Sequence, residues 1–195
     1  TRRCRWAIIG AGFTGLACAR RLAEIHPDDE IILLEARELA QAASGRNSGY
    51  AVACSHFAGP FDPIGLSNYK RVNRINHAGL EMLRQLVRSN DIDCQWHEQG
   101  FYHTAADQQS LGEVAHFSDY LQRLDLPHTV LEPEQLQQRL GTGWYRGGVH
   151  VPIGALAQPA SLVYGLADTL PENVTLHENS PVNSIEQGHG WQLQL

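Results

Sequence analysis

A glycine-rich turn near the N-terminus constrains the fold of this chain more than any other feature. The sequence G-A-G-F-T-G at residues 10–15 directly follows an apolar run at residues 6–9, and a second apolar run, residues 31–34, ends at Glu35. A strand, a glycine turn, a helix and a second strand that ends in an acid form the unit that binds dinucleotides. The sequence therefore predicts a Rossmann-like α/β fold with a dinucleotide site after the first strand.

Each residue of the turn has a physical role in that prediction. Gly10 permits the tight turn, Gly12 lets the backbone approach a pyrophosphate, and Gly15 lets the helix pack close to the sheet. The helix start, which includes Phe13 and Thr14, offers N–H groups and a positive dipole end to phosphates. Glu35 can accept both hydroxyl groups of an adenosine ribose, which disfavours the 2′-phosphate of NADP.

Composition excludes several classes of function. The chain has 195 residues, of which 43% are hydrophobic, and a formal net charge of -6, so we expect a globular core and no nucleic-acid partner. No apolar run is long enough for a transmembrane segment. The four cysteines are widely spaced, which favours free thiols and a cytoplasmic location, with Cys18 in the core. The ten histidines lack the spacing of a metal site, so no metal is expected.

Periodicity predicts the remaining elements. Strands are expected at about 5–9, 31–35, 94–97, 100–105, 147–151, 173–177, 182–186 and 191–195, and helices at about 14–26, 66–89, 108–124, 133–140 and 159–170. The segments 94–97 and 100–105 are expected to form a hairpin. The long helix is expected to bury Leu66, Tyr69, Val72, Ile75, Met82, Leu83 and Leu86. These pieces make an incomplete parallel sheet, so we expect part of a longer protein or completion by another chain.

Several motifs together resemble one known family. The loop A-S-G-R-N-S-G at residues 43–49, the glycine turn and Glu35-Ala36 resemble the FAD-dependent oxidoreductases of the D-amino acid oxidase, glycine oxidase and sarcosine oxidase superfamily, and in particular their gamma-glutamylputrescine oxidase-like branch. Residues 154–162 are similar to the family motif that leads from the substrate domain back into the FAD domain. The resemblance covers this whole chain but only about the first half of a typical member.

The resemblance implies FAD as the cofactor and suggests its contacts. The three glycines of the turn would lie against the pyrophosphate, and Glu35 would hold the ribose. The further contacts implied are Ala36 and Arg37 beside the ribose, Ser44 at the pyrophosphate, Arg46 and Asn47 along the flavin, and Val182 against the adenine.

The resemblance also implies a domain layout and a reaction. Residues 1–55 and 150–195 would form the FAD-binding domain, and residues 56–149 the first part of an α+β substrate domain. The reaction implied is hydride transfer to the flavin from the carbon beside the nitrogen of an amine or amino acid. No catalytic residue is identified, and the candidate pocket-lining residues are Tyr50, His56, Tyr102 and His103.

Two other functions stay open on the sequence alone. An NAD-dependent dehydrogenase shares the glycine turn, although it should continue with a repeated βαβ half directly after the second strand. A non-catalytic dinucleotide-binding module is the other alternative, and it would need a second chain to complete its sheet.

Overall fold

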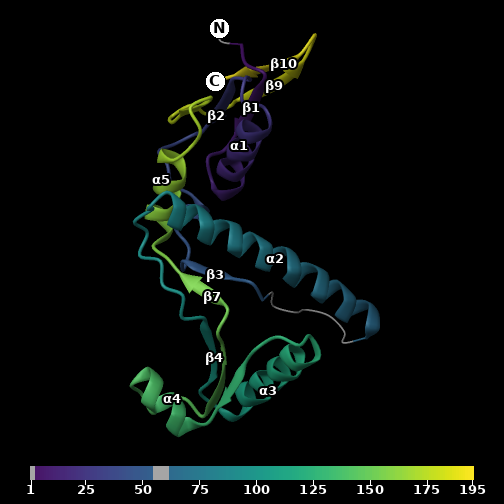
Figure 1. Ribbon diagram of the computed structural model, residues 1–195, viewed down its shortest axis with the longest axis vertical. Coiled ribbons are helices and arrows are strands. Elements are labelled where there is room, and N and C mark those ends of the chain that lie inside the picture. Colours follow the sequence, from purple (N-terminus) through teal and green to yellow (C-terminus); the bar gives the residue numbers. More distant parts are fainter. Residues whose placement is uncertain (1–2, 55–61) are drawn as a thin grey trace. The chain divides into compact units, whose positions relative to one another are not determined.

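The computed structural model describes residues 3–54 and 62–195 (Figure 1). Contacts divide the chain into two compact units. Unit 1 comprises Thr1–Gly49, Leu86–Gln95 and Ala157–Leu195, and unit 2 comprises Tyr50–Gln85 and Trp96–Leu156.

A three-stranded parallel sheet of order β1-β2-β8 forms the centre of unit 1. Its strands are β1 (Trp6–Ile9), β2 (Ile31–Leu34) and β8 (Val174–His177). All four residues of β2 are buried, as expected for the middle strand of a parallel sheet. The predicted α/β fold class is therefore confirmed.

Helix α1 (Phe13–Ile25) connects β1 to β2 and lies alongside both strands (Figure 1). It buries Leu16, Ala19 and Ala23, which recur at helical spacing. Cys18 is exposed on this helix, so its predicted place in the core is wrong. Small alanine side chains on the buried face bring the helix close to the sheet, and Cys18 lies outside that narrow face.

The remaining elements of unit 1 are a helix and a hairpin in residues 157–195 and a short helical turn after β2. Helix α5 (Pro159–Asp168) begins with proline at its first turn, where the missing N–H costs no hydrogen bond. The hairpin of β9 (Ser184–Gln187) and β10 (Trp191–Gln194) ends the chain, with Trp191 opposite Gln187. A short 3-10 helix, η1 (Ala43–Gly45), lies in the loop after β2.

Unit 2 contains a three-stranded antiparallel sheet of order β4-β6-β5 and a short pair of strands. The sheet consists of β4 (Phe101–Ala105), β6 (Gly147–Val151) and β5 (Thr129–Leu131). The pair consists of β3 (Tyr50–Val52) and β7 (Gly154–Leu156), which are antiparallel. The sequence predicted β4 and β6 but missed β3, β5 and β7, each only three residues long.

Three helices accompany these strands: α2 (Pro63–Ser89), whose last turn belongs to unit 1, α3 (Gln108–Arg123) and α4 (Pro133–Leu140). Asp107 caps α3 by accepting from the Ser110 N–H at 2.8 Å, and the hydrogen bonds from Ser110 lower the pKa of that carboxyl group. Helix α4 starts with proline and ends at Gly141, whose φ of 74° is left-handed. The boundaries predicted for these helices are correct to within a few residues.

The predicted hairpin of residues 94–97 and 100–105 is wrong. β4 pairs with β6 instead, with Phe101 opposite Val151 and Ala105 opposite Gly147. The chain before β4 contributes only an isolated bridge from His97 to Leu156. Gly148 of β6 allows this pairing, because a Cβ atom there would lie 3.0 Å from the carbonyl oxygen of His103.

The buried face of α2 also differs from the prediction. Ile75 is 57% exposed and Met82 is 62% exposed, whereas the polar Asn73 is only 6% exposed. The Asn73 amide donates to the Tyr120 hydroxyl at 3.1 Å, so its polar group is satisfied inside the core. The prediction was therefore wrong for Ile75 and Met82, and it did not include Asn73, because it was built from apolar residues alone.

Tyr120 connects α2 to the core of unit 2. Its side chain is fully buried, and its ring makes an edge contact with Tyr69 of α2 at 5.4 Å between centroids. The Tyr120 hydroxyl also hydrogen-bonds the Cys54 thiol. Burial raises the pKa of the Cys54 thiol to about 11 and the pKa of Tyr120 to about 12. Both groups are therefore neutral at physiological pH.

Among the described residues, no helix combines the length and the apolar character needed to cross a bilayer.

Replacing Tyr120 by phenylalanine tests the buried hydrogen bonds. The Y120F variant keeps the ring but removes the hydrogen bond that the Asn73 amide donates to the hydroxyl group, so we expect the free energy of unfolding to fall by about 1–2 kcal/mol. Urea unfolding measures the change. Tyr102 is the matched control, because it is only half-buried and its ring stacks on His150. A Y102F variant that loses as much stability as Y120F would contradict this interpretation.

The cysteines should differ sharply in their reaction with iodoacetamide. We expect Cys18, which is exposed, to be alkylated rapidly in the folded protein, and Cys94, which is buried, to react only after unfolding. Cys54 is buried but lines a cavity, so we expect it to react slowly because its thiol is neutral. Burial raises the pKa of both buried thiols, so even at a pH of about 9 only about one hundredth of the Cys54 thiol is ionised and its alkylation should stay much slower than that of Cys18. Peptide mass spectrometry gives the modified fraction of each cysteine. Rapid alkylation of Cys54 in the folded chain at neutral pH would contradict the raised pKa of its thiol.

Candidate dinucleotide-binding site

The turn after β1 requires glycine at two positions for different reasons. Gly10 has a φ of +94°, which disfavours other residues, and its N–H donates to the carbonyl oxygen of Leu34 at 2.7 Å. A Cβ atom at Gly15 would lie 1.8 Å from the carbonyl oxygen of Gly10, so no larger residue fits there. The first turn of α1 is thus packed directly on the end of β1.

The start of α1 is arranged to receive an anion. Gly12 is the N-cap residue and has no side chain to satisfy the helix N–H groups, and the first turn contains no acidic residue. The Phe13 N–H donates to the Ser44 hydroxyl at 3.1 Å, and Thr14 is exposed. The N–H groups, the positive end of the helix dipole and a hydroxyl group from a second loop meet at one point.

Backbone N–H groups orient the Glu35 carboxylate at the end of β2. Ala11 donates to Oε2 at 2.9 Å, and Arg37 donates to Oε1 at 3.1 Å. Each carboxylate oxygen keeps lone-pair capacity for a further donor such as a ribose hydroxyl group. Ala36 and Arg37 follow in exposed positions. The glycine turn and the acid predicted from the sequence are therefore joined by a direct hydrogen bond.

The loop at residues 43–49 is shaped by its own asparagine. The Asn47 side chain donates to the carbonyl oxygens of Ala43 at 3.0 Å and Ser44 at 2.8 Å, and it accepts from the Gly49 N–H at 2.8 Å. Arg46 is exposed and donates to the Gln41 side chain. Sequence reasoning assigned Asn47 only a flavin contact and missed this local role.

Helix α5 anchors the same loop. A Cβ atom at Gly49 would lie 2.0 Å from the carbonyl oxygen of Ala157, and the Ala157 N–H donates to the Gly49 carbonyl oxygen at 3.0 Å. The Tyr164 hydroxyl donates to the carbonyl oxygen of Leu39 at 3.2 Å. Nothing in the sequence pattern pointed to Tyr164, because its partner is a main-chain atom 125 residues away.

The segment that contains Val182 runs past the end of β2. The Ser180 N–H donates to the Glu35 carbonyl oxygen at 2.8 Å, and the Asn179 N–H donates to the Arg37 carbonyl oxygen at 3.0 Å. Val182 follows as a half-buried residue, but β9 begins only at Ser184, so the strand predicted at 182–186 starts too early. Asn179 has a left-handed φ of 51°, which turns the chain before that strand.

The candidate pocket-lining residues have other neighbours. Tyr102 stacks on His150 with ring centroids 4.6 Å apart, and His103 packs on Phe117 at 5.0 Å. Tyr50 is 56% exposed in β3, and His56 lies outside the described residues. Within the part of the chain that the structure describes, no group of three His, Cys, Asp or Glu side chains is arranged to hold a metal ion.

The donor set of this site fits the adenosine diphosphate part of a dinucleotide. The helix start can pair with phosphate oxygens, and the oriented Glu35 carboxylate can accept hydroxyl groups. A hydrogen-bonding group already lies at this end of the helix, because the Ser44 hydroxyl oxygen accepts from the Phe13 N–H.

Comparisons with known proteins agree with this geometry. Residues 5–195 match the family described as "DAO: FAD dependent oxidoreductase". Gamma-glutamylputrescine oxidoreductase from Escherichia coli K12 is 25% identical over 188 residues, covering 94% of this chain and 43% of that protein.

Solved structures share the fold. Glycine oxidase from Geobacillus kaustophilus matches with a TM-score of 0.79 and 19% identity, covering 99% of this chain and 51% of that one. L-alpha-glycerophosphate oxidase from Mycoplasma pneumoniae, solved with FAD bound, matches with a TM-score of 0.74 and 16% identity, covering 99% of this chain and 50% of that one. This chain spans about half the length of these relatives. Because the family match extends over nearly all of the sequence, the chain belongs to the DAO family of FAD-dependent oxidoreductases.

Proposed function

We propose that this chain binds the adenosine diphosphate part of FAD and forms the N-terminal part of an enzyme that oxidises the C–N bond of an amine or amino acid. The observation that carries the proposal is the hydrogen-bonded group of Ala11, Glu35, Phe13 and Ser44, which joins a carboxylate, a helix start and a second loop. The names of the relatives, which include an oxidoreductase of gamma-glutamylputrescine and a glycine oxidase, support the substrate class.

The main chain of the glycine turn would bind the pyrophosphate. Gly10, Gly12 and Gly15 keep side chains away from it, and the N–H groups at Phe13 and Thr14 would donate to its oxygens. The Ser44 hydroxyl group would either turn from the Phe13 N–H toward the phosphate or form a hydrogen bond with both groups at once.

The remaining proposed contacts surround these groups. Glu35 would hold the ribose, flanked by Ala36 and Arg37, and Val182 would contact the adenine. Asn47 keeps the loop closed, while Arg46 would bring a positive charge that stabilises negative charge on the cofactor.

When bound, FAD supplies the two-electron acceptor that a C–N oxidation requires. The residues of this chain would bind and orient the cofactor, and we assign them no proton transfer. We propose that residues 1–55 and 150–195 serve as the FAD-binding domain and that residues 56–149 begin a substrate domain, although contacts group residues 50–55 and 150–156 with unit 2. Family membership favours FAD over the nicotinamide cofactor of the dehydrogenase alternative.

The cofactor proposal predicts a specific loss of affinity. Glu35→Gln keeps the size of the side chain but removes its charge, so we expect FAD to bind at least roughly tenfold more weakly. Quenching of FAD fluorescence on titration with protein measures the dissociation constant. Glu38→Gln is the matched control, because Glu38 is an exposed carboxylate just beyond the same strand. Equal affinities in all three proteins, or tighter binding of NAD than of FAD, would contradict the proposal.

The substrate class predicts which compounds reduce the flavin. In the enzyme that contains this chain, we expect an amine or an amino acid to bleach the visible flavin absorbance without oxygen and to yield the corresponding carbonyl product and free amine or ammonia. A panel of primary amines, secondary amines and amino acids, read by absorbance under argon, identifies the substrate. Glycerol phosphate is the comparison compound, since a relative of similar fold is named as its oxidase. Reduction by glycerol phosphate alone would overturn the C–N assignment and leave the cofactor proposal intact.

A further inference from the structure

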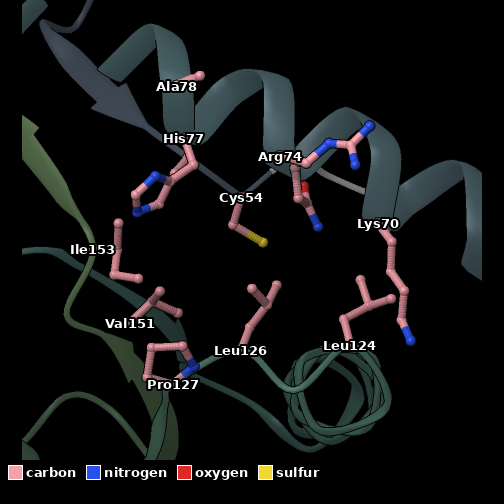
Figure 2. Close-up of a pocket in the computed structure, with 12 residues that line it drawn as sticks. Cys54, Lys70, Arg74, His77, Ala78, Leu124, Leu126, Pro127, Val151 and Ile153 are labelled. Atoms are coloured by element: carbon pink, nitrogen blue, oxygen red, sulfur yellow. The ribbon is translucent and has the colours of Figure 1, made fainter. Parts of the chain in front are cut away.

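Unit 2 contains a cavity of about 420 Å³ between α2, the end of α3 and the end of β6 (Figure 2). Its walls are mainly apolar, and Val151 and Leu124 are almost fully buried. Leu126, Pro127 and Ile153 extend the apolar surface toward the mouth. A volume in this range suits a small organic molecule.

The side of the cavity formed by α2 carries positive charge. Lys70, Arg74 and His77 recur at helical spacing on one face of α2. In Figure 2, Lys70 extends past Leu124, and the Arg74 side chain lies along α2. None of the described residues that line the cavity is acidic.

Lys70 is unusual in this chain. It is the single lysine among the 15 lysine and arginine residues of the sequence. Arg84, on the same helix, pairs with Glu81 and Glu98, but no ion pair with a described carboxylate involves Lys70. A flexible ammonium group beside an apolar cavity is complementary to an anion that carries an apolar body.

The polar groups deep in the cavity are satisfied by the protein itself. Asn73 donates to the Tyr120 hydroxyl at 3.1 Å, and that hydroxyl hydrogen-bonds the Cys54 thiol, which lines the cavity. The thiol is neutral at physiological pH because burial raises its pKa to about 11. The deep part therefore suits an apolar group, and a charged group belongs at the mouth.

We propose that this cavity binds a small carboxylate with an apolar chain, the chain lying against Val151, Leu124 and Leu126 and the carboxylate lying beside Lys70. The site uses residues of unit 2 alone, and the proposed FAD contacts belong to unit 1, so the two proposals can fail separately.

The single lysine allows a direct test. Reductive methylation with ¹³C-formaldehyde labels only Lys70 and the terminal amine, and both keep their charge. We expect sodium octanoate to shift the Lys70 methyl signal in NMR spectra at concentrations that leave the terminal-amine signal unchanged. Acetate, which has no chain, and octanol, which has no charge, should shift it far less. Each methylene group added from butyrate to octanoate should tighten binding roughly fourfold.

Variants on one helix complete the test, with octanoate binding measured by isothermal titration calorimetry. Lys70→Gln should weaken binding at least roughly fivefold, and Arg71→Gln should leave it unchanged, because Arg71 is exposed and does not line the cavity. Ala78→Glu places a negative charge at the mouth and should abolish binding. Ile75→Glu adds the same charge at an exposed position of α2 outside the cavity.

Three results would overturn the proposal. The first is a Lys70 signal that does not move with octanoate. The second is equal binding of octanol and octanoate, which would make the cavity merely apolar. The third is that Ala78→Glu and Ile75→Glu weaken octanoate binding equally. Binding would then depend on the net charge of the helix and not on this cavity.

Discussion

The packing of Gly15 on the carbonyl oxygen of Gly10 is the contact on which the rest of unit 1 depends. A Cβ atom at Gly15 would lie only 1.8 Å from that oxygen, so the first turn of α1 and the end of β1 are in contact through main-chain atoms. This proximity brings the Ala11 N–H to the Glu35 carboxylate. A larger residue at position 15 would move the helix outward and would separate the groups that the candidate site needs together.

The second loop depends on a different kind of constraint. Asn47 uses both ends of its amide to close the loop on itself, and Gly49 lets the loop pass close to Ala157. The hydroxyl group of Ser44 also accepts from the Phe13 N–H. These hydrogen bonds within the folded chain hold the loop in place, and a loop held in place loses less freedom on binding.

Sequence reasoning succeeded where the cause of the structure is local. The glycine turn, the acid at the end of β2 and the proline starts of α4 and α5 each follow from backbone geometry within a few residues. Sequence reasoning failed where a strand pairs with another strand that is distant in the sequence. The strand that pairs with Phe101 lies about 50 residues further on at Val151, and no local pattern distinguishes it from a nearer one.

The residues that a helix buries were harder to predict than the residues at which the helix begins and ends. Asn73 is buried because Tyr120 satisfies its amide, and Cys18 is exposed because alanines define the narrow buried face of α1. The face predicted for α2 was built from apolar residues alone, so it did not include Asn73, and Cys18 was placed in the core because of its position within the helix. A hydrogen-bonding partner across the core can make a polar residue part of the buried face.

The two anion sites argued for this chain use different chemistry, and the difference limits what each can recognise. The helix start of α1 presents main-chain N–H groups in fixed positions, which suits the rigid geometry of a pyrophosphate. The cavity of unit 2 relies on Lys70, a flexible point charge that imposes little direction on its partner. Selectivity there must come from the apolar walls, through the length and shape of the chain that fills them. Substitutions at Leu124 or Val151 should consequently change which carboxylate binds, whereas those at Lys70 should weaken all carboxylates alike.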